Sequence, residues 1–247
     1  MNIVVCIKQV PDTTEIKIDP VKNTLIRQGV PSIMNPFDKN ALETALRLKD
    51  TYGGRVVAIS MGADEGYLIT DRAFGGSDTY ATSYILSQAI EKLGPFDVIL
   101  GGKQAIDGDT GQTAPSIAEH LGATRLTYVL DLKVEGDKVI ARRQVEEGIE
   151  VIETSFPVLC TATKESNKPR YATVSRKLYS LRCDIPELTF ADFPDIDTSK
   201  IGLKGSPTKV KATFTPKRTA TGVTIEGSSP AEIAGSLISK LTEAKVL

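Results

Sequence analysis

Several residue types that mark particular classes of protein are scarce in this sequence. Its 247 residues include one histidine, His120, and three cysteines, Cys6, Cys160 and Cys183. An odd number of cysteines argues against a disulfide framework, and their spacing does not match a zinc site, so we expect buried thiols in a reducing compartment. His120 stands beside Leu121 on a predicted helix, where a structural role is the more common one. A hydrolase or a metal enzyme therefore has little support, and no metal site is predicted.

Strong net charge and long apolar runs are absent as well. The formal charge of -1 gives no sign of a nucleic-acid partner. The apolar stretch in "MNIVVCIKQV" is too short for a signal peptide, and no other run approaches the length of a membrane span. With 40% hydrophobic residues, the chain can bury one large core, or one core with a smaller appendage. We expect a soluble, cytoplasmic protein.

Strands alternate with helices along the first half of the chain. Strands are predicted at "NIVVCIK", "RVVAIS", "YLIT" and "DVIL", and helices at "NPFDKNALETALRLKD" and "TYATSYILSQAIEKLG". In the first helix Asn35 can act as the cap, Pro36 fits the first turn, and apolar residues follow at helical spacing. This alternation predicts an α/β domain with a doubly wound, mainly parallel sheet, in which ligands bind beyond the carboxyl ends of the strands.

The pattern changes in the second half. The stretch "TYVLDLKVEGDKVIARRQVEEGIEVIETS" alternates apolar and polar residues between turn signals, which predicts a β-meander over 124–156, and "PVLCTAT" predicts one more buried strand. From about residue 184 the chain is irregular, until a final helix that Ser229 and Glu232 are predicted to open with a capping box. The pattern leaves open whether this extended arm, 184–247, lies across another subunit or packs on its own domain, 1–183.

One connection is too short for this fold. The strands "RVVAIS" and "YLIT" are separated only by "MGADEG", whereas neighbouring parallel strands need a crossover of roughly a dozen residues. Either the two strands form a hairpin, or a helix is missing between them.

A polar segment, "GGKQAIDGDTGQTAP" at 101–115, joins the strand "DVIL" to a short amphipathic stretch. Neither GxxxxGK[ST] nor a GxGxxG after a strand is present, so the standard phosphate-binding fingerprints are missing. Gly108 and Gly111 would still let the backbone approach a ligand closely. Thr110, Gln112 and Thr113 lie where the unpaired N–H groups of the next helix can meet a phosphate.

Two carboxylates in this segment complicate phosphate binding. Asp107 and Asp109 would repel a phosphate at close range, so we expect at least one of them to bind ribose hydroxyls or to cap the turn. The alternative is a polar surface loop with self-capping aspartates.

Five stretches together resemble the β subunits of electron-transferring flavoproteins over essentially the whole chain: "VVCIKQVPDT", "SIMNPFDKNALETALRLK", "GGKQAIDGDTGQTAPSIAEHLG", "FPVLCTAT" and "NKPRYATVSRK". The resemblance implies a heterodimer with an α subunit, in which each subunit contributes an α/β domain related to the adenine nucleotide α hydrolases. It also implies that the β subunit holds either a structural AMP or a second FAD.

The resemblance further implies which residues contact this nucleotide. They lie at the end of the first strand, at the start of the first long helix, at Met61 and in the segment 102–113. The matching positions are Cys6, Asn35, Pro36, Phe37, Asp38, Met61, Gly102, Gln104, Ala105, Ile106, Asp107, Gly108, Asp109, Thr110, Gly111, Gln112 and Thr113.

The stretch "DRAFGGSDTYATS", 71–83, resembles the electron-bifurcating members of the family and favours FAD over AMP. Thr79 and Thr82 match positions that contact the flavin, and Arg72 could place a positive charge near reduced flavin. A plainer reading, compatible with the first, is a helix entry capped by Ser77 or Asp78.

A bifurcating member takes electrons from NADH. It sends them to ferredoxin or flavodoxin and, through the FAD of the α subunit, to a partner dehydrogenase such as an acyl-CoA dehydrogenase. Two alternatives stay open. One is a non-bifurcating β subunit that binds structural AMP and carries electrons from dehydrogenases. The other is a stand-alone nucleotide-binding stress-type protein, against which the meander and the C-terminal arm argue.

The loop 165–183, which contains "ESNKPRYATVSRKLYSL", resembles the partner-recognition loop of the family. Val174 occupies the position of its apolar anchor and is surrounded in the sequence by cationic residues, as in docking through one pocket and a charged rim. A solvated basic loop is the alternative. The expected partner-binding residues are Pro169, Arg170, Tyr171, Val174, Arg176 and Lys177. The resemblance also implies that the C-terminal arm and helix pack on the α subunit.

Relatives carry a helix between the residues that are Gly62 and Ala63 here. The resemblance thus implies that roughly fifteen residues, the size of a minimal crossover, are missing at this point. A true deletion would remove a helix that flanks the sheet and leave apolar surface open; otherwise, this sequence omits a segment that the protein has.

Overall fold

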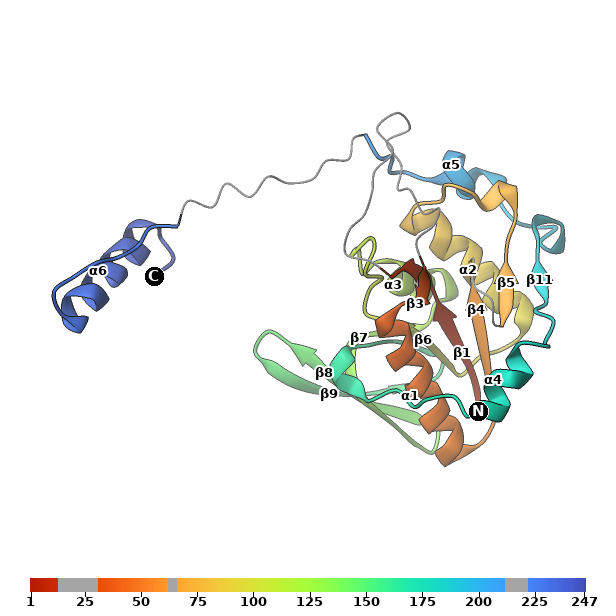
Figure 1. Cartoon of the computed structure of the whole chain (residues 1–247). Coiled ribbons are helices and arrows are strands. Elements are labelled where there is room, and N and C mark those ends of the chain that lie inside the picture. Colours follow the sequence, from red (N-terminus) through yellow and green to blue (C-terminus); the bar gives the residue numbers. More distant parts are fainter. Residues whose placement is uncertain (13–30, 62–65, 212–221) are drawn as a thin grey trace. The chain divides into compact units, whose positions relative to one another are not determined.

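The computed structural model describes residues 1–12, 31–61, 66–211 and 222–247 (Figure 1). The chain divides into two compact units, Met1–Lys211 and Ala212–Leu247. In the described part of the first unit, the main sheet has the strand order β11-β5-β4-β1-β6-β10-β7-β8-β9. Its strands are β1 (Asn2–Ile7), β4 (Arg55–Ser60), β5 (Tyr67–Ile69), β6 (Val98–Gly102), β7 (Thr124–Glu135), β8 (Lys138–Val145), β9 (Gly148–Ser155), β10 (Val158–Ala162) and β11 (Glu187–Leu188). A separate antiparallel pair consists of β2 (Gln9–Pro11) and β3 (Ser32–Met34).

The central strands are parallel, and the direction of winding reverses between β1 and β6. β1 pairs with β4 on one side and with β6 on the other, and β6 continues to β10 and β7. The chain therefore builds one half of the sheet outward from β1 and then returns to β6 for the other half. The predicted doubly wound, mainly parallel sheet is confirmed. Its topological switch point, the usual place for a ligand, lies between the carboxyl ends of β1 and β6.

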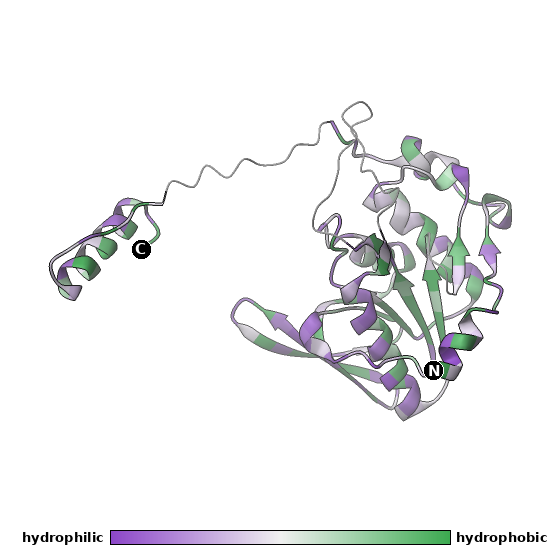
Figure 2. Ribbon diagram, viewed as in Figure 1, coloured by the Kyte–Doolittle hydropathy of each residue, from purple (hydrophilic) through white to green (hydrophobic). Residues whose placement is uncertain are grey.

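Helices cover both faces of this sheet. They are α1 (Pro36–Tyr52) on one face and α2 (Thr79–Leu93) and α3 (Thr113–Leu121) on the other. In β1, Ile3 and Val5 are buried in the same cluster as Ala45 of α1, whereas Val4 is buried with Ile85 of α2. A strand that is covered on both faces must be apolar along its whole length. The hydropathy colouring of the central strands in Figure 2 shows this.

The predicted meander extends the sheet beyond β7. β8 pairs antiparallel with β7, and β9 pairs antiparallel with β8. The turn after β7 contains Gly136 with a φ of +64°, a left-handed conformation that glycine adopts at little cost. Val139 and Ala141 point into the core, while Ile149 and Val151 on the edge strand are exposed.

The short connection after β4 joins parallel strands. Ser60 of β4 pairs with Leu68 of β5 in parallel register, so the hairpin alternative is wrong. The junction between Gly62 and Ala63, where the resemblance places a missing helix, lies outside the described residues.

The α1 face of β4 is less well covered than that of β1. Ile3 is fully buried, whereas Val56, its partner on β4, and Ala58 are only partly buried. If a helix that flanks this face of the sheet were absent, the side chains of Val56 and Ala58 would be left partly exposed, as they are here.

The first part of the expected arm packs on the first unit. β11 pairs in parallel with β5, and Leu188, Phe193, Ile196 and Ile201 are buried in the core beside α2. The first unit therefore extends to Lys211, beyond the boundary at residue 183 that the sequence suggests.

The second unit contains α6 (Pro230–Glu243). Ser229 caps the helix by accepting a hydrogen bond from the N–H of Glu232. The Glu232 carboxylate, however, accepts from the N–H and hydroxyl of Ser228 and not from Ser229, so only half of the predicted capping box forms. Leu237 and Ile238 are exposed. No helix among the described residues is long and apolar enough to cross a membrane.

Candidate nucleotide-binding site

A cavity of about 700 Å³ lies at the switch point, where β1 and β6 end. This volume is within the range of roughly 300–1,000 Å³ that is usual for small-molecule sites. The starts of α1, α2 and α3 and the loop after β6 converge on it. Of the predicted nucleotide-contacting residues, the cavity is lined by Cys6, Asn35, Asp38, Met61, Thr79, Thr82, Gly102, Gln104, Ala105, Gly108, Thr110, Gly111, Gln112 and Thr113.

The start of α1 holds the loop after β6 in place. Asn35, expected to cap α1, makes no side-chain cap hydrogen bond. Its amide instead donates to the carbonyl of Gln104 at 2.8 Å and accepts from the N–H of Ile106 at 3.3 Å. Asn35 therefore acts as a bridge between α1 and the loop that borders the cavity.

Asp38 joins the ends of the two strands that flank the switch point. Its carboxylate accepts hydrogen bonds from the N–H of Lys8, after β1, at 2.8 Å and from the N–H of Gly102, at the end of β6, at 3.0 Å. Burial raises the pKa of Asp38 to about 6, although these hydrogen bonds oppose the shift. Burial, with a smaller contribution from Asp38, also raises the pKa of Cys6 to about 12, so this thiol is protonated at neutral pH.

Gly102 is required by the close approach of α1. A Cβ atom at this position would lie 2.6 Å from the Cβ atom of Phe37, much nearer than van der Waals contact allows. Because Gly102 has no side chain, the start of α1 can pack directly against the end of β6. This brings the Asp38 carboxylate within hydrogen-bonding distance of the Gly102 N–H.

The two aspartates of the loop are paired within the protein. The ammonium group of Lys8 forms an ion pair with Asp107 at 2.6 Å, and the amide of Gln104 donates to Asp109 at 2.8 Å. Asp109 has a φ of +49°, which is uncommon for a residue with a side chain. Neither aspartate lines the cavity. Because Lys8 and Gln104 bind these two carboxylates, the aspartates should repel a phosphate in the cavity less than the sequence suggests.

Two of the three helices that start at the cavity, α2 and α3, differ in the capping of their N-termini. At α2, Asp78 accepts from the N–H groups of Tyr80 and Ala81, which confirms Asp78, of the two predicted candidates, as the cap. At α3, Gln112 makes no side-chain cap hydrogen bond, and both Thr113 and Ala114 line the cavity. The N-terminus of α3 is therefore the better placed of the two to bind an anion.

Six predicted residues are not among those that line the cavity, and the reasons differ. Pro36 and Phe37 lie in the first turn of α1, where Asp38 and Asn35 face the cavity in their place. Arg72 is exposed in a short 3₁₀ helix, Arg72–Phe74. The residues outside the lining are Pro36, Phe37, Arg72, Ile106, Asp107 and Asp109.

Sequence reasoning missed several lining residues. Lys8 and Lys103 line the cavity, with their ammonium groups at Asp107 and over the ring of Tyr128. Both follow a buried strand directly, which is the signal that could have identified them. Gly75, Gly76 and Ser77, which precede α2 in the sequence, also line the cavity.

The three cysteines and the histidine differ in their surroundings. Cys160 is buried, and burial raises its pKa to about 12, but Cys183 is exposed, so the expectation of three buried thiols is wrong for Cys183. His120 packs edge-on against Tyr80 and Tyr84, and burial lowers its pKa. No cluster that could hold a metal ion is found among the described residues.

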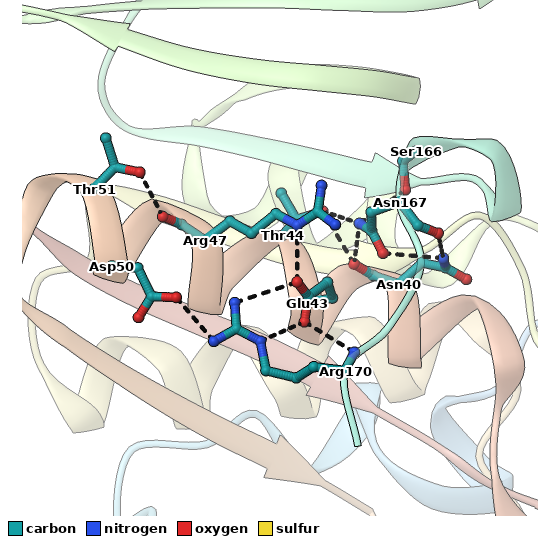
Figure 3. A network of polar contacts seen from close by, with 9 residues as sticks. All are labelled: Asn40, Glu43, Thr44, Arg47, Asp50, Thr51, Ser166, Asn167 and Arg170. Atoms are coloured by element: carbon teal, nitrogen blue, oxygen red, sulfur yellow. Dashed lines mark hydrogen bonds and ion pairs between the residues drawn. The ribbon is translucent and has the colours of Figure 1, made fainter. Parts of the chain in front are cut away.

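The expected partner-recognition loop lies on the outer side of α1 and leads into α4 (Val174–Ser180). Arg170 is bound to Glu43 and Asp50 of α1, as Figure 3 shows. Val174 and Tyr171 are exposed, with relative accessibilities of 77% and 94%. Pro169 is partly buried, and Arg176 and Lys177 are exposed.

A sequence profile described as "Electron transfer flavoprotein domain" matches residues 22–189. The chain belongs to the electron transfer flavoprotein family. The "Electron transfer flavoprotein subunit beta" of Clostridium acetobutylicum is 51% identical over 98% of both chains, and that of Thermoanaerobacterium thermosaccharolyticum is 48% identical over 100% of both. The "Caffeyl-CoA reductase-Etf complex subunit CarD" of Acetobacterium woodii is 46% identical over 100% of both. Membership among the β subunits of this family implies an α-subunit partner.

The alignments also show a difference in length. The alignment with the Thermoanaerobacterium flavoprotein subunit spans 262 positions and includes essentially all 247 residues of this chain. About fifteen positions of that relative therefore have no counterpart here. This is the size of the segment that the resemblance predicts to be missing.

Proposed function

We propose that this chain binds FAD in the cavity at the switch point and acts as the β subunit of an electron-bifurcating heterodimer. The observation that carries the proposal is the set of donors around the cavity. The uncapped start of α3, two lysines and the hydroxyls of Thr79 and Thr82 surround one space. Such a set suits a phosphate-containing ligand with further polar groups.

The geometry fits the parts of such a nucleotide. Thr113 and Ala114, at the start of α3, would meet a phosphate through their N–H groups. The ammonium group of Lys8 or Lys103 would join them only by turning away from Asp107 or from the ring of Tyr128. Thr79 hydrogen-bonds to Gln112 at 3.5 Å, so the starts of α2 and α3 face each other across the cavity. The chemistry that FAD supplies when bound is acceptance of hydride from NADH and release of electrons one at a time.

Residues of this chain would set the surroundings of the flavin. Cys6, protonated at neutral pH, is a neutral neighbour at the end of β1. Asp38 already uses both carboxylate oxygens for backbone N–H groups, so its role is to hold β1 and β6 at a fixed separation. We infer that electrons pass from NADH to ferredoxin or flavodoxin and, through the FAD of the α subunit, to a flavin dehydrogenase.

Docking of that dehydrogenase is assigned to the segment around α4. Val174 and Tyr171 expose apolar surface beside Arg176 and Lys177, as expected of an anchor with a charged rim. The CarD relative is by its name a subunit of a caffeyl-CoA reductase complex, which supports a partner that acts on CoA esters, such as an acyl-CoA dehydrogenase. The exposed apolar face of α6 is proposed to pack on the α subunit.

The second candidate is a non-bifurcating β subunit with structural AMP. AMP is the adenylate part of FAD, so the start of α3 and the lysines would serve either ligand. Residues that contact the flavin ring system would be needed for FAD but not for AMP. Thr79 and Thr82 are the candidates for such contacts.

The test is the nucleotide content of the purified heterodimer. After denaturation, FAD is measured by absorbance and AMP by chromatography. Two FAD and no AMP per heterodimer are expected. One FAD and one AMP would contradict the proposal and support the second candidate.

A matched pair of variants assigns the second FAD to this cavity. Thr82→Val should lower the content from two FAD towards one. Thr51→Val removes a hydroxyl that bonds only within α1, to the carbonyl of Arg47, and should leave both FAD in place. Equal FAD content in the two variants would show that Thr82 does not contact the flavin.

A further inference from the structure

The segment that carries the proposed docking helix has little packing of its own. No residue of α4 is buried, and Tyr171, Val174, Leu178 and Leu181 all expose apolar side chains. Packing therefore does not fix where α4 lies. Its position depends on the residues that flank it. Residues 164–170 before it cross the outer side of α1, and β11 after it pairs with β5.

Glu43 is the centre of the contacts that hold those residues. Its side chain is 5% exposed. The guanidinium group of Arg170 donates to both carboxylate oxygens, from Nε at 2.8 Å and from Nη2 at 3.2 Å, and the N–H of Arg170 donates as well, at 3.2 Å. The Nε atom of Arg47 donates to the same carboxylate at 2.8 Å. Two-pronged pairs of this kind fix orientation as well as distance.

A second clamp lies one turn earlier on α1. The amide of Asn40 donates to the carbonyl of Asn167 at 2.8 Å, and the amide of Asn167 donates back to the carbonyl of Asn40 at 3.0 Å and to Thr44 at 2.9 Å. Figure 3 shows both clamps along one side of α1. The start of the same helix is bonded to the cavity loop through Asn35, so α1 cannot shift freely.

Charges in the segment fall into two groups. Arg170 is used internally, by Glu43 and by Asp50 at 2.8 Å. For Lys168, Arg176 and Lys177 no ion pair is found within the described part of the chain, and they are exposed. The charge of Arg170 therefore holds the segment on α1, whereas the charges of the other three residues are available to a partner.

We propose that Glu43 is a positioning residue for partner docking: by binding Arg170, it holds the segment 164–182 on α1 and so sets where Val174 is presented. This inference rests on the docking role proposed for α4. It assigns a function to a buried carboxylate that lies outside the cavity and has no part in nucleotide binding.

The first experiment is hydrogen exchange of the intact heterodimer, read by peptide. Glu43→Gln and Arg170→Gln should each raise exchange over residues 168–182 by about tenfold, as the loss of roughly one net charge-assisted hydrogen bond predicts. Arg170→Lys, which keeps one charge, should give an intermediate value. The matched control is Lys138→Gln, which removes an exposed ion pair with Glu153 on the meander and should not change exchange in this segment. Unchanged exchange in both Glu43→Gln and Arg170→Gln would overturn the proposal.

The second experiment measures electron transfer between the heterodimer and a purified acyl-CoA dehydrogenase as a function of dehydrogenase concentration. Glu43→Gln should raise KM for the dehydrogenase about three- to tenfold with kcat and FAD content unchanged, because the docking surface is displaced and the redox centres are not. Faster exchange with an unchanged KM would overturn the proposal, provided that Val174→Asp raises KM. If Val174→Asp also leaves KM unchanged, the docking function is the part that fails, and the exchange result alone decides whether Glu43 holds the segment.

Discussion

Two segments leave neighbouring strands at the same edge of the sheet and use their polar residues in different ways. Ala162 of β10 pairs with Gly102 of β6, and the N–H of Lys103 donates to the carbonyl of Ala162 at 2.9 Å. The loop after β6 borders the cavity. Asp109 is bonded within the loop and Asp107 to Lys8 after β1, and the loop backbone is bonded to the side chain of Asn35. The segment after β10 crosses α1, and its apolar side chains face solvent.

α1 supports both segments, which explains how they can differ. Its cap residue Asn35 and its first turn, through Asp38, bind the loop, and its next three turns supply Asn40, Glu43 and Asp50 to the segment. The loop is thereby shaped before a ligand arrives, as small-molecule sites usually are. The segment is held by α1 before α4, and the chain is held again by β11 after it, whereas α4 itself is exposed and so open to a partner.

The largest effect is expected from closing the gap between α1 and β6. Gly102→Ala puts a Cβ atom against Phe37, so we expect a loss of about 1–3 kcal/mol in stability and a heterodimer without nucleotide in this subunit. Gly222→Ala is the control, because its Cβ atom would meet nothing within 4 Å and Gly222 does not line the cavity. Thermal unfolding and FAD content measure both. Normal FAD content in Gly102→Ala would show that the close approach of α1 is not needed for the cavity.

The second-largest effect is expected from a change in the segment 164–182 alone. Val174→Asp should raise KM for the partner dehydrogenase about tenfold or more, because an apolar anchor would become a charge that must be buried on docking. FAD content and thermal stability should not change, since Val174 is exposed. Val151→Asp, a similarly exposed valine on β9, serves as the control. Equal KM values for the two variants would contradict docking through Val174.

Two carboxylates on α1 should respond to pH in opposite directions. Burial raises the pKa of Asp38 to about 6, so its ionised form costs stability. Lowering the pH from 7 to 5 should therefore stabilise the protein through Asp38 by roughly 1 kcal/mol. Burial alone would raise the pKa of Glu43, but hydrogen bonds from Arg170 and Arg47 outweigh it and hold the pKa below its usual 4.5. The stabilisation from Glu43 is present above pH 4.5 and is lost as the pH falls further.

Thermal unfolding of the heterodimer against pH separates these contributions. Asp38→Asn should remove part of the gain between pH 7 and pH 5. Glu43→Gln should instead flatten the loss of stability below about pH 4.5. Identical pH profiles for the wild type and both variants would mean that neither carboxylate titrates as the structure indicates.

The sheet and the place of the site could be predicted from the sequence because both depend on local patterns. Continuous apolar runs predicted the central strands, and the polar segment after "DVIL" pointed to the carboxyl edge where the cavity lies. These inferences need only the hydrophobic periodicity of the sequence and the known topology of parallel sheets.

The individual contacts could not be predicted because they join residues far apart in the sequence. Asn35 looks like a helix cap, yet its amide bonds a loop that begins 69 residues later. Asp107 looked like a ribose ligand or a turn cap, and Lys8 binds it from the other side of the switch point. Arg170 looked like part of a charged rim, but it binds a carboxylate buried on α1. A polar side chain has many possible partners, and only the packed fold selects one.

The smallest effect concerns the charges that the segment leaves unpaired. The double variant Arg176→Gln, Lys177→Gln should slow association with the dehydrogenase by about two- to fivefold at low salt and make the rate less dependent on ionic strength, because rim charges act mainly on encounter. The dissociation rate should change little, since exposed pairs contribute little energy once the complex has formed. Stopped-flow mixing over a range of salt concentrations measures both rates.

Arg170→Gln gives the contrast. Because Arg170 is bound to Glu43, its loss should displace Val174 and so raise the dissociation rate. The salt dependence of association should stay near that of the wild type. The same salt dependence in the two variants would mean that Arg170 meets the partner directly, and the division between holding and docking charges would then be wrong.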